Sequence, residues 1–381
     1  MKTVALLYLF LFVAFFDLHA QYPVLSPFAI SLGATPAFIG LMMGIYACSH
    51  IPGNLLAGRA VDRYGSRIFI STSLILAGFI LLIQAFITNP MQLLAARAAS
   101  GFVLAFLTPA CQSLLAQIGK TEEGQGKLMA GSGIVHMLAS VIAPGIGALF
   151  VAHYGFSSAF LVLGSALILI GFLSQLFLPK QISATTRLSA TTIPFGDEKP
   201  EISIRDFAVP VAVAFSQAVL YFELPLRGDI VSDGAIHQTG LQFALISLGA
   251  TTTLSMLFLN RVAAIPRILF GSGILSLLFF ILAFETERSF AILLVLIGMA
   301  KGLIYPAISA FLASRTNASG YGRVFAWLSI SYSIGAFIGP LVAGQLRTFI
   351  SPYFLAFLML GCAFLILTAR FDNCQPATYQ R

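Results

Sequence analysis

The sequence predicts an all-α integral membrane protein, with twelve transmembrane helices arranged as two six-helix bundles. Hydrophobic residues make up 58% of the 381 residues and charged residues only 9%, with a mean hydropathy of +0.94. A soluble domain carries about 25% charged residues, so this composition cannot supply a water-facing surface. Apolar runs of membrane-spanning length follow one another along the chain, and its two halves resemble each other, which predicts two matching bundles.

The apolar runs place the helices in order along the chain. We expect them at roughly 3–22, 37–57, 68–88, 91–118, 128–152, 158–178, 207–226, 240–259, 266–285, 289–313, 324–346 and 352–370. About 20 apolar residues are needed to span a bilayer as a helix, and these ranges are close to or above that length.

The first range also has the outline of a secretory signal peptide, since a lysine and an apolar run precede "DLHA". Leu18 and Ala20 would hold the two positions before the cleavage site, where leucine fits poorly because small residues are required. Cleavage would leave eleven helices and remove the counterpart of the helix at 207–226. We therefore predict that residues 3–22 are retained as the first membrane helix.

The distribution of basic residues predicts the orientation. Of the 21 Lys and Arg residues, sixteen fall in segments that this topology places inside the cell, and three, Arg227, Arg288 and Arg347, fall outside. The remaining two, Arg97 and Lys301, lie within helices. Cytoplasmic loops carry the excess of basic residues, so both termini are expected in the cytoplasm. The net charge of +7 is explained in this way and predicts no nucleic-acid partner.

The halves are predicted to be residues 1–178 and 207–381, joined by a polar cytoplasmic linker at 179–206 that is rich in Ser, Thr and Pro. At a constant offset of 196, residues 124–150 match residues 320–346 without a gap, with Pro144 opposite Pro340. "TPACQSLLA" at 108–116 also matches "YPAISAFLA" at 305–313. A duplicated six-helix unit is the architecture of many secondary transporters, whose substrates bind between the repeats.

The segment "GRAVDRYGSR" at 58–67 resembles the loop signature of the major facilitator superfamily. "RAASGFVLA" at 97–105 resembles that family's fourth-helix pattern. "SVIAPGIGA" at 140–148 and "YPVLSP" at 22–27 resemble motifs of its drug:proton antiporter branch, the latter at the end of helix one. The resemblance covers all twelve predicted helices. The residues identified with the packing and antiporter-like motifs are Pro144, Gly147, Gly335, Gly339, Pro340 and Gly344.

The resemblance implies that the loop signature is a cytoplasmic gate, made of Gly58, Asp62, Arg63, Gly65 and Arg67. Its glycines permit a tight turn, and Asp62 is suited to cap a helix or pair with an arginine. In the family the Asp faces the start of the eleventh helix, here Gly322–Arg323, where the helix dipole and the arginine would attract an anion. The alternative is an ordinary solvated turn.

Charges within the bilayer are costly and mark functional sites by default. The candidates are Asp17, Arg97, Glu223 and Lys301. Asp17 and Arg97 lie at similar depth, about five or six residues from the outer ends of their helices at about 1.5 Å per residue, so we predict that they pair. Asp17 at the membrane interface is the alternative. Glu223 is the corresponding acid of the second half, and Lys301 is suited to bind an anionic substrate or to hold Glu223.

Other polar side chains in the helices are candidates for a substrate cavity: His19, His50, His136, Gln217, Tyr305 and Tyr332. His136 and Tyr332 occupy matching positions in the repeats, which predicts a shared cavity-facing place. Histidine titrates near physiological pH, so His136 and His50 are suited to a proton or substrate role. A packing role is the alternative for both.

The resemblance implies a monomeric transporter of the cell membrane that exports a small organic molecule in exchange for protons by alternating access. The proton gradient is then the energy source, and no cofactor or metal is expected. A proton-driven importer, or a facilitator of a metabolite, nutrient or metal chelate, is the alternative. The chain contains no HExxH or GxSxG motif, so an enzyme is not expected. The lipid bilayer and a small molecule of unassigned identity are the expected partners.

Overall fold

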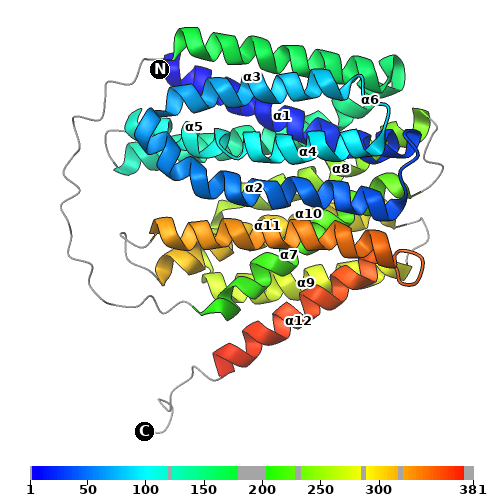
Figure 1. The fold of residues 1–381 in the computed structure, drawn as a ribbon. Helices are drawn as coiled ribbons and strands as arrows, with labels where there is room; N and C mark the ends of the chain where they lie inside the picture. The colour runs from blue at the N-terminus through cyan, green and yellow to red at the C-terminus, as the bar shows by residue number, and fades with distance from the viewer. Residues whose placement is uncertain are drawn as a thin grey trace, which may run out of the picture. The chain divides into compact units, whose positions relative to one another are not determined.

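In the computed structural model every described element is a helix, and the helices are long (Figure 1). The structure describes residues 2–118, 122–178, 203–227, 233–284, 289–315 and 321–372. The predicted linker at 179–206 therefore falls largely outside the described residues. Its described end forms the short helix η1 (Ile204–Phe207), capped by the Ser203 side chain.

The described residues of the first half of the chain form six helices. These are α1 (Lys2–Ser31), α2 (Pro36–Tyr64), α3 (Ser66–Gln84), α4 (Pro90–Leu104), α5 (Leu107–Ile118) and α6 (Glu122–Phe177). The second half contains α7 (Ala208–Glu223), η2 (Leu224–Leu226), α8 (Asp233–Ser255), η3 (Leu257–Arg261), α9 (Ala264–Phe284), α10 (Phe290–Ser314), α11 (Tyr321–Leu346) and α12 (Pro352–Asp372). Each of the predicted ranges overlaps one or more of these helices, although several bounds differ.

The first helix is longer than predicted, because it continues through "YPVLSP" to Ser31. The prediction that this motif lies at the end of the helix is wrong, since Pro23 and Pro27 are both inside α1. Membrane helices tolerate proline where neighbouring groups satisfy the freed backbone atoms. The helix stops at Gly33, whose φ of 87° reverses the chain and whose backbone N–H donates to the Ile30 carbonyl.

The predicted fourth helix is two helices, α4 and α5, with a break at Ala105–Phe106. Pro109 accounts for the break, because its ring lacks an N–H group and clashes with the carbonyl four residues earlier, that of Ala105. The predicted fifth and sixth helices correspond to the two parts of α6, which meet at Gly155, where φ is 79° and the backbone is not helical. We refer to residues 122–154 and 156–177 as the first and second limbs of α6.

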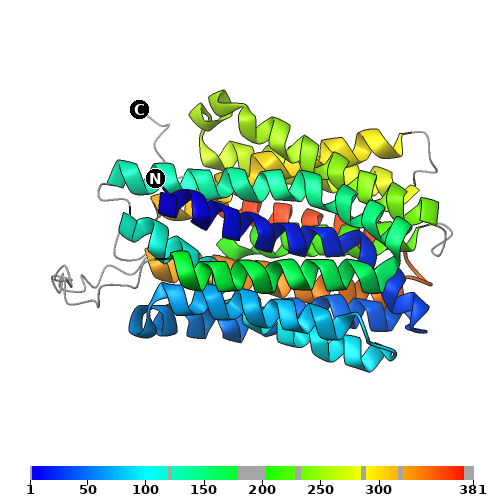
Figure 2. The ribbon, with the colours of Figure 1, turned by 90° about the horizontal axis from the view of Figure 1, so that it is seen from above.

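The chain forms two compact units. Unit 1 contains residues 1–33, 48–199 and 231–240, and unit 2 contains residues 34–47, 200–230 and 241–381. Within unit 1, α1 runs between the two limbs of α6 (Figure 2). Gly131 and Gly147 of the first limb lie against Tyr8 and Ala20, and Phe160 of the second limb packs on Phe28 with ring centroids 5.1 Å apart.

Unit 1 also joins α3 to the second limb of α6, where Gly78 faces Gly164 and the Ser71 and Ser174 hydroxyls lie 2.6 Å apart. Within unit 2, α7 packs on α11 and α12, and α9 packs on α10 and α12. Small residues at these contacts allow close helix approach, as is common in membranes.

Two short helix segments belong to the unit that does not contain the rest of their helix. The first part of α2, residues 34–47, packs on α11, where Gly40 faces Pro340 and Gly344. The first part of α8 packs on α6 in the same way, with Gly240 facing the Pro144 carbonyl. Because Pro144 and Pro340 match in the internal repeat, these two contacts are counterparts.

Nine stretches among the described residues are long and apolar enough to cross a membrane. One of them, Gly131–Phe177, covers two of the predicted helices. The stretches do not include α2 and α8, which are less hydrophobic on average than the other long helices. The chain is therefore a multi-pass membrane protein, and the count of twelve spans stays a prediction.

The contact of α8 with α10 yields a testable prediction about packing. A Cβ atom on Gly298 would fall on the carbonyl oxygen of Ile246. Overpacking of this kind costs about 1–3 kcal/mol, so Gly298→Ala is expected to lower the melting temperature of the purified protein by several degrees. Gly361→Ala is the matched control, since the nearest atom to its Cβ is 3.7 Å away. Equal melting temperatures for the two variants would contradict this packing.

Candidate functional site

A buried polar network crosses unit 1 between α1 and α4. The Gln21 amide nitrogen donates to Asp17 Oδ1 over 2.9 Å, and Arg97 donates to Gln21 Oε1 over 3.1 Å. Exposure is 2% for Asp17, 4% for Gln21 and 4% for Arg97. We call these three residues the Asp17–Arg97 relay. Gln21 joins an acid and a base that are both removed from solvent, because an amide both donates and accepts.

Local structure explains how the relay forms. Asp17 and Gln21 are four residues apart on α1, so they share one face of the helix. Asn89 caps α4 by accepting from the Met91 backbone N–H over 2.8 Å, with Pro90 at the first turn. Sequence reasoning placed Asp17 and Arg97 at one depth but missed Gln21. The i, i+4 spacing from Asp17 was the signal that could have identified it.

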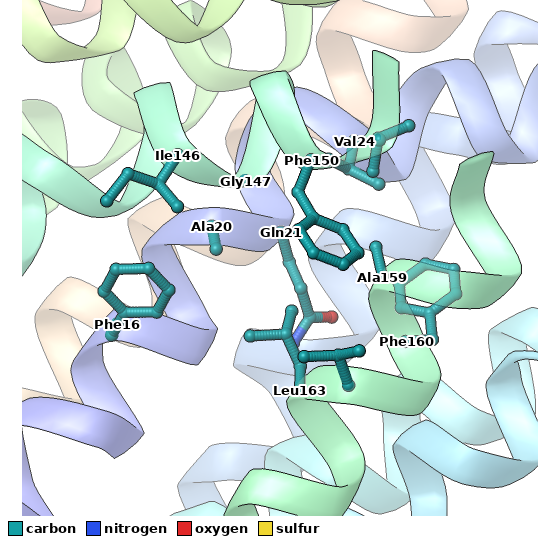
Figure 3. A pocket seen from close by; sticks show the side chains of 12 residues that line it. Phe16, Ala20, Gln21, Val24, Ile146, Gly147, Phe150, Ala159, Phe160 and Leu163 are labelled. Atoms are coloured by element: carbon teal, nitrogen blue, oxygen red, sulfur yellow. The ribbon is translucent and has the colours of Figure 1, made fainter. Parts of the chain in front are cut away.

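A small pocket lies beside the relay, between α1 and both limbs of α6 (Figure 3). Its volume is about 130 Å³, and Gln21 is the polar side chain among its otherwise apolar lining. In the close-up Phe150 lies next to Gln21, and Phe160 lies further away on the same side. The pocket therefore offers an apolar surface next to the central member of the Asp17–Arg97 relay.

Two of the predicted cavity histidines meet in unit 1. The Nε2 atoms of His19 and His136 are 3.2 Å apart, a hydrogen bond whose donor depends on the tautomer. Phe15 packs edge-on against His136 at 4.3 Å, and Tyr22 packs against His19 at 5.5 Å. His19 is 6% exposed, whereas His136 is exposed. The pair joins α1 to the first limb of α6.

The predicted acid of unit 2 has a partner that sequence reasoning assigned to an outer loop. Arg347 donates to both oxygens of Glu223, with Nε–Oε2 at 2.9 Å and Nη2–Oε1 at 3.0 Å. Its Nη2 also donates to the Leu226 carbonyl over 2.8 Å. The suggestion that Lys301 holds Glu223 is therefore corrected. Arg347 directly follows α11, close enough to reach the end of α7, and its planar fork matches a carboxylate.

Lys301 lies elsewhere in unit 2, on α10. Its Nζ atom is 5.4 Å from the ring centre of Tyr221 on α7, and the residue is 5% exposed. One turn further along both helices, the Tyr305 hydroxyl donates to Gln217 Oε1 over 2.5 Å. Tyr332 of α11 packs on Tyr305 with ring centroids 5.6 Å apart. The structure thus brings together four of the predicted candidates, Lys301, Gln217, Tyr305 and Tyr332.

The loop signature is mostly helical. Gly58 lies inside α2, so it makes no turn, and Gly65 alone reverses the chain, with φ of 92°. Gly65 also occupies the N-cap position of α3, and the prediction that Asp62 caps a helix or pairs with an arginine stays a prediction. Arg67 donates to the Gln175 carbonyl at the end of α6, and the exposed Arg63 lies over the Tyr64 ring. The side chains of Asp62 and Arg323 lie outside the described residues, so the proposed gate contact is untested.

The glycines of the antiporter-like motifs lie at close helix contacts. A Cβ on Gly147 would be 2.6 Å from the Ala20 carbonyl oxygen, and one on Gly339 would be 2.7 Å from that of Phe215. Gly335 lies similarly against Val211, and Gly344 against Pro36. These residues hold α6 on α1 and α11 on α7 and α2.

The remaining cavity candidate, His50, bonds within its own helix, because its Nδ1 lies 2.9 Å from the Asn54 amide nitrogen. No group of three or more His, Cys, Asp or Glu suited to a metal occurs among the described residues. The predicted candidates in the helices therefore lie in one network and one histidine pair in unit 1, in two clusters in unit 2 and, for His50, in a contact within α2.

Comparisons with known proteins agree with this architecture. The family model described as the Major Facilitator Superfamily matches residues 7–284. An uncharacterised MFS-type transporter of Methanocaldococcus jannaschii is 24% identical, with 91% of each chain covered. The multi-drug resistance efflux pump PmrA of Streptococcus pneumoniae is 23% identical, covering 81% of this chain and 80% of the pump.

Solved structures show the same fold. A bacterial homologue of the human lysosomal transporter Spinster, in an inward-facing and unoccupied conformation, matches with a TM-score of 0.78 and 16% identity, covering 99% of this chain and 98% of that one. The nucleoside transporter NupG matches with a TM-score of 0.72 and 15% identity, covering 98% and 100%. The chain therefore belongs to the major facilitator superfamily and is a membrane transporter rather than an enzyme.

Proposed function

We propose that this protein exports a small organic molecule across the cell membrane in exchange for protons, by alternating access. The observation that carries the proposal is the Asp17–Arg97 relay, in which a carboxyl group and a guanidinium are buried together and joined by one amide. The proposal includes a monomer with twelve spans and both termini in the cytoplasm. Its energy source is the proton gradient.

The relay is suited to proton exchange because the affinity of Asp17 for a proton depends on the geometry of the relay. Burial and a nearby cation act in opposite directions on the affinity of a carboxyl group for a proton. Gln21 sets how closely Arg97 acts on Asp17, and it sits on the wall of the 130 Å³ pocket. A movement of α1 relative to α4 that breaks one of these hydrogen bonds changes whether Asp17 holds a proton.

Two observations support export as the direction. Relatives over most of the chain include the efflux pump PmrA, and proteins named multidrug resistance protein MdtG, such as that of Serratia proteamaculans at 25% identity. The motifs around Pro144 and Pro340 also resemble those of the drug:proton antiporter branch. Glycine contacts around both prolines place helices in van der Waals contact. Helices packed in this way can move together as one rigid body, which alternating access requires.

Everted membrane vesicles test the function and its direction together. Vesicles containing the protein, acidified inside by respiration, are given three radiolabelled probes that share one ring system: 1-naphthoate, 1-naphthamide and 1-naphthylmethylammonium. We expect at least one probe to accumulate above the level in vesicles without the protein, and the accumulation to vanish when nigericin collapses the pH gradient. Accumulation that persists without the gradient, or none of any probe, would contradict proton-coupled export, and proton-driven loss from the vesicles would indicate import.

A further inference from the structure

Lys301 is a buried basic residue for which the described residues supply no counter-charge. The residue is 5% exposed, and within the described residues its recorded interaction is the approach to the Tyr221 ring, 5.4 Å from Nζ to the ring centre. Burying a charge without a counter-charge is strongly unfavourable. An aromatic face attracts a cation only weakly, so it does not replace an anion.

The acid that could have balanced Lys301 is engaged elsewhere. Both oxygens of Glu223 accept hydrogen bonds from Arg347. In unit 1 the buried acid and base, Asp17 and Arg97, are joined by Gln21. Of the four charges predicted within the membrane helices, three thus have polar partners on the protein, and the fourth is a single positive charge.

The residues around Lys301 provide further donors for an anion. Lys301 and Tyr305 are four residues apart on α10, and Tyr221 and Gln217 are four residues apart on α7, so each pair lies along one helix face. The two faces meet, since Lys301 approaches Tyr221 and Tyr305 donates to Gln217. This bond uses the Gln217 oxygen, and the amide nitrogen has no recorded partner among the described residues. Two donor groups, one ammonium and one amide, therefore lie about one helical turn apart.

The walls of this cluster are aromatic. Tyr221 packs edge-on against Phe243 at 4.9 Å, and Tyr305 packs edge-on against Tyr332 at 5.6 Å. Gln217, Tyr305 and Tyr332 are half-buried, whereas Lys301 is buried. Aromatic side chains favour a planar apolar ligand by offset or edge-to-face packing.

We propose that Gln217, Tyr221, Lys301, Tyr305 and Tyr332 form a binding site for an organic monoanion with an aromatic ring. Lys301 and the Gln217 amide bind its carboxylate, and the tyrosines pack on its ring. One unbalanced positive charge matches one negative charge on the ligand. The proposal assigns a substrate class to the transport function proposed above. In that respect the binding-site proposal rests on the proposed transport function.

Binding to the purified protein tests this site without a proton gradient. The dissociation constants of 1-naphthoate and of its uncharged analogue 1-naphthamide are measured by calorimetry in detergent or nanodiscs. Wild type is expected to prefer the carboxylate. Lys301→Met is expected to weaken 1-naphthoate binding by about tenfold or more, as expected for a lost hydrogen bond to a charged group, with little change for 1-naphthamide. Lys301→Arg, which keeps the charge, is expected to restore part of the preference.

Controls separate the site from general electrostatics and from misfolding. Arg205→Met removes one exposed positive charge from the same unit and is expected to leave both constants unchanged. Gln217→Leu is expected to weaken 1-naphthoate binding severalfold, so the site can be tested even if Lys301→Met does not fold. Equal binding of the two probes by wild type, or unchanged preference in both Lys301→Met and Gln217→Leu, would overturn the proposal. These binding assays need no proton gradient, so their failure contradicts the binding site and not proton-driven export. Failure of accumulation in vesicles contradicts proton-driven export and not the binding site.

Discussion

Replacing Asp17 with Asn is expected to abolish the dependence of transport on the pH gradient. The variant keeps a side chain that can bond to Gln21, but it cannot bind or release a proton. Coupling between two sites typically corresponds to about 1–3 kcal/mol, or roughly 5- to 150-fold, so proton-driven accumulation should fall by about that factor. The measurement is the ratio of probe accumulation in everted vesicles with and without nigericin.

Three further variants show whether the effect belongs to the carboxyl group. Asp17→Glu keeps an acid on the same helix face and should retain part of the coupling, and Gln21→Ala removes the link to Arg97 and should reduce it. Glu223→Gln tests the corresponding acid of unit 2 and is also expected to reduce the pH dependence. The carboxylate hypothesis is wrong if Asp17→Asn and Glu223→Gln both keep the full response to nigericin.

Removing Arg347 is expected to destabilise unit 2, because it leaves the buried Glu223 carboxylate without its counter-charge. Breaking a fully buried pair costs several kcal/mol, and the Arg347 side chain is 30% exposed, so we expect Arg347→Met to cost about 2 kcal/mol. The melting temperature of the purified protein should fall by about 4–8 °C. Arg347→Lys should recover only part of this, since lysine cannot make the two parallel hydrogen bonds.

The double variant is the sharper measurement. Glu223→Gln/Arg347→Met removes both charges, so it should melt at a higher temperature than Arg347→Met alone. This non-additivity follows from an uncompensated buried charge and is the signature of direct coupling. If the double variant is the least stable of the set, the ion pair is not the source of the effect.

Local sequence properties were sufficient for much of the fold. Apolar run length predicted the positions of the helices, because a helix in lipid satisfies all its backbone groups internally. Gly65 was recognised as a turn residue, since glycine adopts positive φ without a steric penalty. Helix ends were less accurate, as Pro23 and Pro27 inside α1 show. Whether a proline ends a helix depends on its neighbours in space.

The partners of the buried charges could not be predicted in the same way. Asp17, Arg97, Glu223 and Lys301 stood out because charges are rare inside membrane helices. The Gln21 bridge and the ion pair of Arg347 with Glu223 depend on how helices distant in the chain are rotated and packed. Composition and hydrophobic periodicity report how far one segment lies from water. A hydrogen bond between helices requires the donor and acceptor atoms to be placed to within a few tenths of an ångström. The packing of the whole unit specifies these positions.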